Sequence, residues 1–443
     1  MSDPLPGLDP HVLLTFLLQV SVLLVVALGL GRLAVRLGLP ALVGELLTGV
    51  LLGPSLLGTI APGLLSWVLP ADAGQLHLVD AVGQFGVLLL VGVTGIQLDT
   101  TMLRKRGVTG LRVSLAGLLL PLALGVGAGF LVPAALLTDH SERGVFALFL
   151  GVAMCVTAIP VIAKILADMG LLHRDIGQLT LAAGTVDDAV GWFLLSVVSA
   201  AATTGVRAGA VSLSILYLVL FVAAAYFLGR PAARWLMRRV HGGPRVTVAV
   251  VVILLGAAAT QAMGMEALFG AFVAGLLIGQ ARDGEGLLWK DLTPLRTVVL
   301  SVLAPLFLAT AGLRMDLTAL ADPKVLLAGI ALLLVAVIGK FAGAYLGARA
   351  SRLSHWEGIA LGAGMNARGV VEVVVATTGL RLGVLSIATY TVIVLIAVVT
   401  SVMGPPILRL AMSRLEQTPA EQQRELALAG TPTGTPVTTG AHR

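Results

Sequence analysis

Charged residues and cysteine are scarce in this chain of 443 residues. Asp, Glu, Lys and Arg make up 12% of it, against roughly 25% in soluble domains. Hydrophobic residues make up 57%, and the mean hydropathy is +0.99. A soluble fold could not bury that much apolar surface, so an ordinary cytosolic enzyme and a nucleic-acid-binding protein are both excluded, despite the net charge of +6. The composition predicts an all-α integral membrane protein.

Several functional signals are also missing. The one cysteine, Cys155, cannot form an internal disulfide. No Gly-x-x-x-x-Gly-Lys-Ser/Thr loop is present, so nothing indicates an ATPase, and the histidines lack metal-ligand spacing. The N-terminus lacks the basic region of a cleaved signal peptide. We therefore expect no enzyme activity, no cofactor and no nucleic-acid partner.

About 13 apolar stretches are candidate transmembrane helices of roughly 20 residues each. They are residues 11–34, 41–59, 78–98, 109–134, 143–168, 175–202, 207–229, 245–262, 265–281, 293–313, 323–349, 354–379 and 383–411.

Basic residues are distributed unevenly between the connections. Connections after odd-numbered spans carry eighteen Lys and Arg residues, and those after even-numbered spans carry five. The positive-inside rule then predicts a multi-pass protein of the cell membrane with its N-terminus outside and its C-terminus in the cytoplasm. Residues 412–443 turn polar and are rich in Thr, Pro, Gly and Gln, which predicts a disordered cytoplasmic tail.

Two pairs of segments indicate an internal repeat. Residues 44–53 match residues 270–279 with three glycines shifted by 226 positions, and residues 94–99 match 311–316 with a shift of 217. Spans 2 and 3 thus correspond to spans 9 and 10. An offset of seven spans is odd, so the halves have opposite orientations, as in secondary transporters. The sequence predicts two inverted six-helix repeats, spans 1–6 and 8–13, joined by span 7.

The alternative explanation of the shared glycines is helix packing, because Gly-x-x-x-Gly lets helices approach closely in any membrane bundle. Gly49, Gly53, Gly275 and Gly279 are expected to pack helices under either explanation.

Two adjacent aspartates, Asp187 and Asp188, lie near the middle of the sixth span. Each is roughly 18 Å from a helix end, too far to reach water. Carboxylate oxygens suit small hard cations, and buried neighbouring carboxylates also bind protons. One site could therefore hold either a cation such as Na⁺ or protons, and this competition suffices for exchange.

Three further charges, Lys340, Arg368 and Glu372, lie well inside predicted spans. Lys340 is either a buried ammonium paired with one of the two aspartates or a side chain that extends to the membrane surface. Arg368 and Glu372 are spaced i,i+4, which favours a structural ion pair; direct ion binding by Glu372 is the less favoured alternative.

Helix-breaking residues interrupt two equivalent spans. The fifth contains Thr157-Ala-Ile-Pro160, and the twelfth contains a glycine-rich run around Asn366. Matched breaks in both halves predict two discontinuous helices that cross at a midplane binding site, where unwound carbonyls and Thr157 could add oxygen ligands.

These motifs together resemble the monovalent cation:proton antiporter superfamily, in its cation:proton antiporter-2 branch. The resemblance runs from about residue 11 to 411. It is carried by residues 44–58, residues 157–166, the Asp187-Asp188 span and residues 364–372.

The resemblance implies a homodimer in which one domain of each protomer dimerises and a mobile core carries the ion in an elevator-like movement. The corresponding residues are 11–98 and 245–313 for the dimerisation domain, 109–202 and 323–411 for the core, 207–229 for a linker helix, and 412–443 for the tail. In electrogenic sodium members a carboxylate pair faces a lysine, and Asp187, Asp188 and Lys340 occupy those positions.

The expected function is electrogenic Na⁺(Li⁺)/H⁺ antiport, with membrane lipid as the surroundings. K⁺/H⁺ antiport is the first alternative, because selectivity depends on cavity size and ligand number. Proton-coupled export of an organic ion or ionophore is the second. A channel is disfavoured, because conduction needs weak, multiple sites.

Overall fold

The computed structural model describes residues 9–63, 73–97, 100–138, 141–204, 208–281 and 287–429. Within these ranges the chain is helical apart from turns, short extended segments and one isolated bridge between Leu137 and Leu385. The all-α prediction is confirmed. Three residues that contribute to the predictions above lie outside the described ranges. They are Asp99 of the repeat segment 94–99, and Arg207 and Arg282 of the counted basic residues.

Eleven helices in the described part of the chain are long and apolar enough to cross a membrane. The bent pair α17 (His355–Met365) and α18 (Val370–Arg381) makes a twelfth if it is taken as one span. The ninth expected span is helix α13 (Ala267–Gly279), which has 13 residues and is only about 20 Å long. It is too short to cross a bilayer core of about 30 Å unaided.

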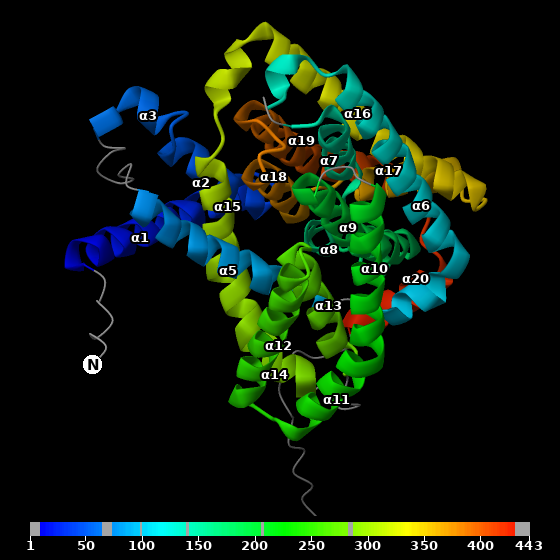
Figure 1. Ribbon diagram of the computed structural model, residues 1–443. Coiled ribbons are helices and arrows are strands. Elements are labelled where there is room, and N and C mark those ends of the chain that lie inside the picture. The colour runs from blue at the N-terminus through cyan, green and yellow to red at the C-terminus, as the bar shows by residue number, and fades with distance from the viewer. Residues whose placement is uncertain are drawn as a thin grey trace, which may run out of the picture.

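The first bundle joins helices from both halves of the chain. Its members are α1 (Pro10–Arg36), α2 (Ala41–Leu52), α5 (Ala73–Gln97), α12 (Gly243–Ala262), α13 and α15 (Ala304–Leu313). Short elements adjoin it: α3 (Leu57–Ile60), α14 (Leu287–Val298) and the π-helical turn η3 (Val299–Leu303). In Figure 1 the blue helices α1, α2 and α5 lie against the yellow-green α15.

The contacts within this bundle are reciprocal. Helix α2 packs on α15, and its counterpart in the repeat, α13, packs on α5. A Cβ on Gly49 would lie 2.0 Å from the backbone oxygen of Ala309, and one on Gly275 would lie 2.0 Å from that of Gly92. Any larger side chain at these two positions would therefore push the backbones apart.

The turns before α2 and α13 also match. Gly38 and Gly264, again 226 positions apart, both have φ of +75°, a left-handed conformation that favours glycine. The next residue in each case donates a backbone hydrogen bond of 2.9 Å to the residue five positions earlier, Leu39 to Ala34 and Met265 to Thr260. The repeat therefore extends to the hydrogen bonds that end these helices.

The second bundle contains the two broken spans. Its members are α6 (Thr100–Leu131), α7 (Arg143–Cys155), α8 (Ile159–Asp168), α9 (Asp175–Thr204), α16 (Pro323–Ala350), α17, α18 and α19 (Ile387–Met412). The short 3₁₀ turns η1 (Ala134–Leu136) and η4 (Leu317–Ala321) adjoin it. Helix α6 packs along α16 and α7, and α17 packs on α19 and α9.

The linker helix is longer than predicted. Helix α10 (Ala208–Ala224) continues through a π-helical turn, η2 (Ala225–Gly229), into α11 (Arg230–Arg239). The prediction that the helix ends at residue 229 and is followed by a basic loop is wrong. Arg238 and Arg239 lie in the last turn of α11, where cations stabilise the negative end of a helix.

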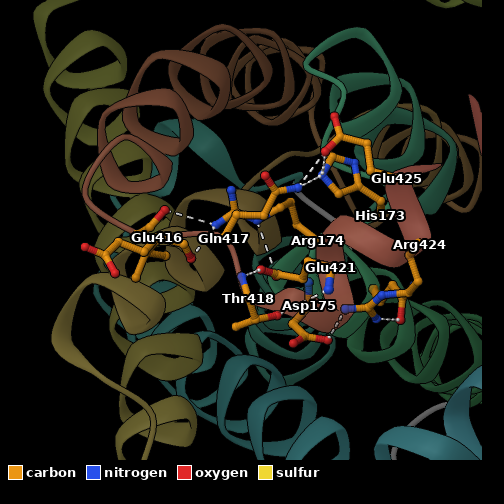
Figure 2. A network of polar contacts seen from close by, with 11 residues as sticks. His173, Arg174, Asp175, Glu416, Gln417, Thr418, Glu421, Arg424 and Glu425 are labelled. Atoms are coloured by element: carbon orange, nitrogen blue, oxygen red, sulfur yellow. Dashed lines mark hydrogen bonds and ion pairs between the residues drawn. The ribbon is translucent and has the colours of Figure 1, made fainter.

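The tail prediction is wrong for Pro419–Ala429, which form helix α20; residues 430–443 lie outside the described ranges. Figure 2 shows how α20 docks on the turn between α8 and α9. Glu421, 3% exposed, accepts hydrogen bonds from the backbone N–H groups of Asp175 (2.6 Å) and Thr418 (2.8 Å). Arg174 lies 3.3 Å from the same carboxylate. Composition alone suggested disorder because these stabilising partners lie in a distant segment.

The Glu421 carboxylate is held in its charged form. Burial by itself raises the pKa of Glu421, but the two backbone N–H donors and the Arg174 charge outweigh burial and lower the pKa below its ordinary 4.5. Because the pKa is lowered in the folded state, this contribution to docking is present above pH 4.5 and is lost as the pH falls through the lowered pKa.

We expect Glu421→Gln to release α20 at neutral pH, since the amide loses the charge that binds Arg174. Trypsin cleavage after Arg424, which donates a 2.8 Å hydrogen bond to Asp175 when docked, should become several-fold faster. The control is Glu416→Gln, which removes the same charge from an exposed position. Equal cleavage rates in the two variants would contradict the docked arrangement.

Candidate functional site

The two broken helices form the centre of the second bundle. Helix α7 ends at Cys155, residues 156–158 are extended, and α8 begins at Ile159. Pro160 lies in the first turn of α8, where the missing N–H removes no helical hydrogen bond. The second break covers residues 366–369, and α17 and α18 are bent by 46° there.

Cationic side chains cap the buried C-terminal end of α7. Arg368, in the second break, donates hydrogen bonds to the backbone oxygens of Ala153 (3.0 Å) and Met154 (2.7 Å). Lys340 donates to that of Cys155 at 2.6 Å. The last carbonyls of a helix lack intrahelical partners and carry partial negative charge. Both cations therefore donate hydrogen bonds to carbonyl oxygens that the break leaves without a helical partner.

Asp187 is fully buried and has three hydrogen-bond donors. Its Oδ2 accepts from Lys340 Nζ at 2.5 Å and from Thr157 Oγ1 at 2.8 Å. Its Oδ1 accepts from Ser114 Oγ at 2.5 Å. Lys340 is also fully buried, so of the two alternatives for this residue the structure has the buried ion pair.

Asp188 differs from its neighbour. It too is 0% exposed, but neither carboxylate oxygen has a hydrogen-bond partner among the described residues. The backbone N–H of Ile159, at the positive end of α8, faces it without completing a hydrogen bond of normal geometry. An unpaired buried carboxylate costs several kcal/mol unless it takes up a proton or a cation. Asp188 is thus the carboxylate of the two that has no hydrogen-bond partner in the described structure.

Arg368 and Glu372 form the predicted i,i+4 pair, with Arg368 Nη1 3.2 Å from Glu372 Oε1 and both side chains buried. Arg368 also donates to Ala336 of α16 at 3.0 Å. Asn366, 2% exposed, has an amide oxygen with no partner in the described structure. These three residues lie at the second break. Gly49, Gly53, Gly275 and Gly279 lie in the first bundle, against α5 and α15.

Ser114 was not predicted. It is a buried hydroxyl on α6, and only its position opposite Asp187 distinguishes it from the other hydroxyls of the apolar helices. No group of three or more His, Cys, Asp or Glu side chains that could hold a metal ion occurs in the described ranges. A cation bound at Asp187 and Asp188 would therefore need hydroxyl, amide or backbone oxygens for its remaining ligands.

A cavity of about 520 Å³ lies between the two bundles. It is lined by the C-terminal ends of α9, α15 and α18, the middle of α5, and the turn between α12 and α13. Arg381 of α18 crosses this space, 3.0 Å from Glu266 and 2.8 Å from Gln84. Arg314 forms an ion pair with Asp80 within the first bundle.

A family model described as the transmembrane sodium/hydrogen exchanger matches residues 20–413. The chain belongs to this family. It is a multi-span protein of a transporter family, and the resemblance inferred from its motifs is confirmed.

The Na⁺/H⁺ antiporter NhaS4 of Synechocystis is 31% identical over 408 residues, covering 90% of this chain and 98% of that protein. Cation/H⁺ antiporter 18 of Arabidopsis thaliana is also 31% identical, but the chain spans only 48% of its length. The solved sodium proton antiporter MjNhaP1 of Methanocaldococcus jannaschii shares the fold, with a TM-score of 0.65 at 16% identity over 95% of this chain and all of that one.

The contrast between the two aspartates predicts opposite effects on stability. Asp187→Asn leaves the Lys340 ammonium buried without its partner, which should lower the free energy of unfolding by about 3–5 kcal/mol. Asp188→Asn breaks no hydrogen bond and should leave the melting temperature in cation-free buffer unchanged or higher.

Added Na⁺ or Li⁺ should raise the melting temperature of the wild type, because a ligand that binds only the folded state stabilises it. Asp188→Asn should lose this response, and Asp168→Asn, at an exposed carboxylate on α8, should keep it. A cation response that survives in Asp188→Asn would show that the cation binds elsewhere.

Proposed function

We propose that this protein is a cation/proton antiporter that exchanges Na⁺ or Li⁺ for H⁺ at Asp188. The observation that carries the proposal is a buried, unpartnered carboxylate beside a second one that is already neutralised by a lysine. One carboxylate that holds either a cation or a proton couples the two fluxes, because the occupants exclude each other.

In the proposed site, two further polar groups complete the coordination of the cation. Thr157 lies in the first break and contacts Asp187, and Asn366 has a free amide oxygen in the second break. Asp188, Thr157 and Asn366 supply the oxygen ligands that a small hard cation requires. Pro160, Arg368 and Glu372 hold the broken helices in place and do not contact the ion.

Lys340 gives the exchange its charge balance. An entering cation competes with the ammonium for Asp187, and a buried ammonium without a partner tends to lose its proton. That proton and the one from Asp188 make two protons for each cation. Transport then moves net charge across the membrane and responds to voltage.

The two bundles have separate roles in this proposal. The first, with spans 1–3 and 8–10, forms the homodimer, and its glycine contacts keep it rigid. The second, with spans 4–6 and 11–13, carries the site across the bilayer of the cell membrane. The turn that binds α20 faces the cytoplasm, and the cavity lined by Arg314 and Arg381 faces outside, as the distribution of basic residues indicates.

K⁺/H⁺ antiport is the second candidate. K⁺/H⁺ antiporter 1 of Saccharomyces cerevisiae is 29% identical, although the chain spans only 43% of its length. The ion pair between Lys340 and Asp187 favours Na⁺ over K⁺ as the substrate, because it resembles the site of the electrogenic sodium members of the family.

The cation is identified with purified protein in liposomes that contain a pH-sensitive dye. Na⁺ and Li⁺ should each drive proton movement at lower concentrations than K⁺, and an organic cation such as choline should not. A K⁺ response at equal or lower concentrations would replace the sodium proposal with K⁺/H⁺ antiport. No response to any of the three cations, in vesicles shown to be sealed, would reject cation/proton antiport.

The charge balance is tested with an imposed membrane potential. Voltage alone should drive Na⁺ flux through the wild type, and Lys340→Gln should weaken that response while some exchange remains. Lys324→Gln is the control, because it removes the same charge from the exposed first turn of the same helix. Wild-type flux that ignores voltage would establish electroneutral exchange in place of the electrogenic mechanism.

A further inference from the structure

Four residues with polar side-chain atoms lie along one face of α9. They are Asp188, Trp192, Ser196 and Ser199, with spacings of four, four and three residues. At the α-helical repeat these positions fall within a sector of about 80°. The helix therefore presents one polar side chain per turn from the proposed ion site toward its C-terminal end.

Every one of these residues is buried and has polar atoms without a hydrogen-bond partner in the described structure. The atoms are both carboxylate oxygens of Asp188, the indole Nε1 of Trp192 and the hydroxyls of Ser196 and Ser199. None of the four residues is more than 5% exposed. Thr180 and Thr185, earlier on the same helix, instead donate to the backbone carbonyl of the preceding turn.

Such a line requires an explanation, because more than about 90% of buried polar groups in folded proteins have a partner. Water or a passing ion supplies partners that the protein itself does not. Four unpartnered groups in sequence on one helix face, starting at the free carboxylate, therefore indicate a route along which water, protons or cations move.

The line ends at the cavity between the bundles. Ser199 lines that cavity together with Thr203, one turn further along α9. From Asp188 to Ser199 the helix rises by roughly 16 Å. The cavity wall opposite α9 includes Thr310 and Glu266 of the first bundle, and the Glu266 carboxylate is paired with Arg381.

An aromatic pair interrupts the line one turn beyond Asp188. The Trp192 ring, 1% exposed, lies 6.3 Å from the ring of Phe272 between centroids, with an angle of 35° between the planes. Trp192 belongs to α9 and Phe272 to α13, so the pair spans the contact between the two bundles. Relative movement of the bundles would separate the rings.

We infer that this face of α9 is the outer access route to Asp188, with Ser196 and Ser199 as transient ligands of the passing cation and Trp192–Phe272 as its closure. The inference rests on the proposed antiport function. The rings shut the route in the conformation that the structure shows, and the serine hydroxyls replace part of the hydration shell of the cation when the rings part.

Single cysteines test the route directly, because the one native cysteine, Cys155, is buried. Ser196→Cys and Ser199→Cys are compared with Ala201→Cys, which is equally buried but about 180° away around the same helix. A membrane-impermeant cationic methanethiosulfonate is added outside proteoliposomes in which the protein has one orientation. Ser199→Cys should react about ten-fold faster than Ala201→Cys, since accessible thiolates react preferentially.

The closure is tested by removing either ring. In Phe272→Ala, and separately in Trp192→Ala, Thr185→Cys should react several-fold faster with the outside reagent than it does with both rings present, because residue 185 lies on the same face of α9 but on the inner side of the rings. Two ring variants are used in case one of them does not fold. A monodisperse elution profile in detergent identifies the variants that fold.

Equal, slow labelling at residues 196, 199 and 201, or labelling from the cytoplasmic side alone, would overturn the outer route. Antiport is measured separately on unlabelled wild type. Fast labelling of Ser199→Cys without cation-driven proton movement would support the route and reject the proposed function. Cation-driven proton movement with slow labelling of Ser199→Cys would support the function and reject the route.

Discussion

The buried ion pair between Lys340 and Asp187 determines the arrangement of the second bundle. Through one ammonium and one carboxylate it joins α16 to α9, to the end of α7 at the Cys155 oxygen, and to α6 through Ser114. Removing one member of such a pair costs about 3–5 kcal/mol, because the other charge stays buried. The pair is stable only while each charge has a partner, so whatever displaces the lysine must supply compensation. In the proposed mechanism, that requirement couples the cation to the proton.

The broken helices follow the same rule. Unwound backbone is tolerated inside a membrane only where its polar groups find partners in the protein. Arg368 supplies them for Ala153 and Met154 at the end of α7, and it also donates to Ala336 of the distant helix α16. Its charge is in turn balanced by Glu372. Asp188 and Asn366, which lie beside these satisfied groups, are left with free oxygens. The hydrogen-bonded carbonyl groups stabilise the unwound segments, and the oxygens of Asp188 and Asn366 are available for an ion.

The contacts inside the first bundle differ in kind from those between the bundles. Gly49 and Gly275 bring backbone against backbone, an arrangement that a small displacement would disrupt. Between the bundles the contacts include side-chain pairs, Trp192 with Phe272 and Arg381 with Glu266. Side-chain contacts can separate and form again with little change in the backbone, and backbone contacts at glycines cannot. This difference supports movement of one bundle against the other as the mechanical basis of the proposed transport.

The sequence by itself determined the features that depend on composition, periodicity or local chemistry. Apolar length located the spans, matched glycines revealed the repeat, and Pro160 with the Asn366 segment marked the two breaks, because each signal lies within a few consecutive residues. Only the tertiary structure decided which aspartate holds the lysine and which stays free, since that choice depends on the rotation of helices whose interacting residues are 153 positions apart. It also placed Ser114 against Asp187 across 73 positions and converted a tail that composition marks as disordered into a docked helix. In each case the stabilising partner belongs to a distant segment, so no local pattern could encode it.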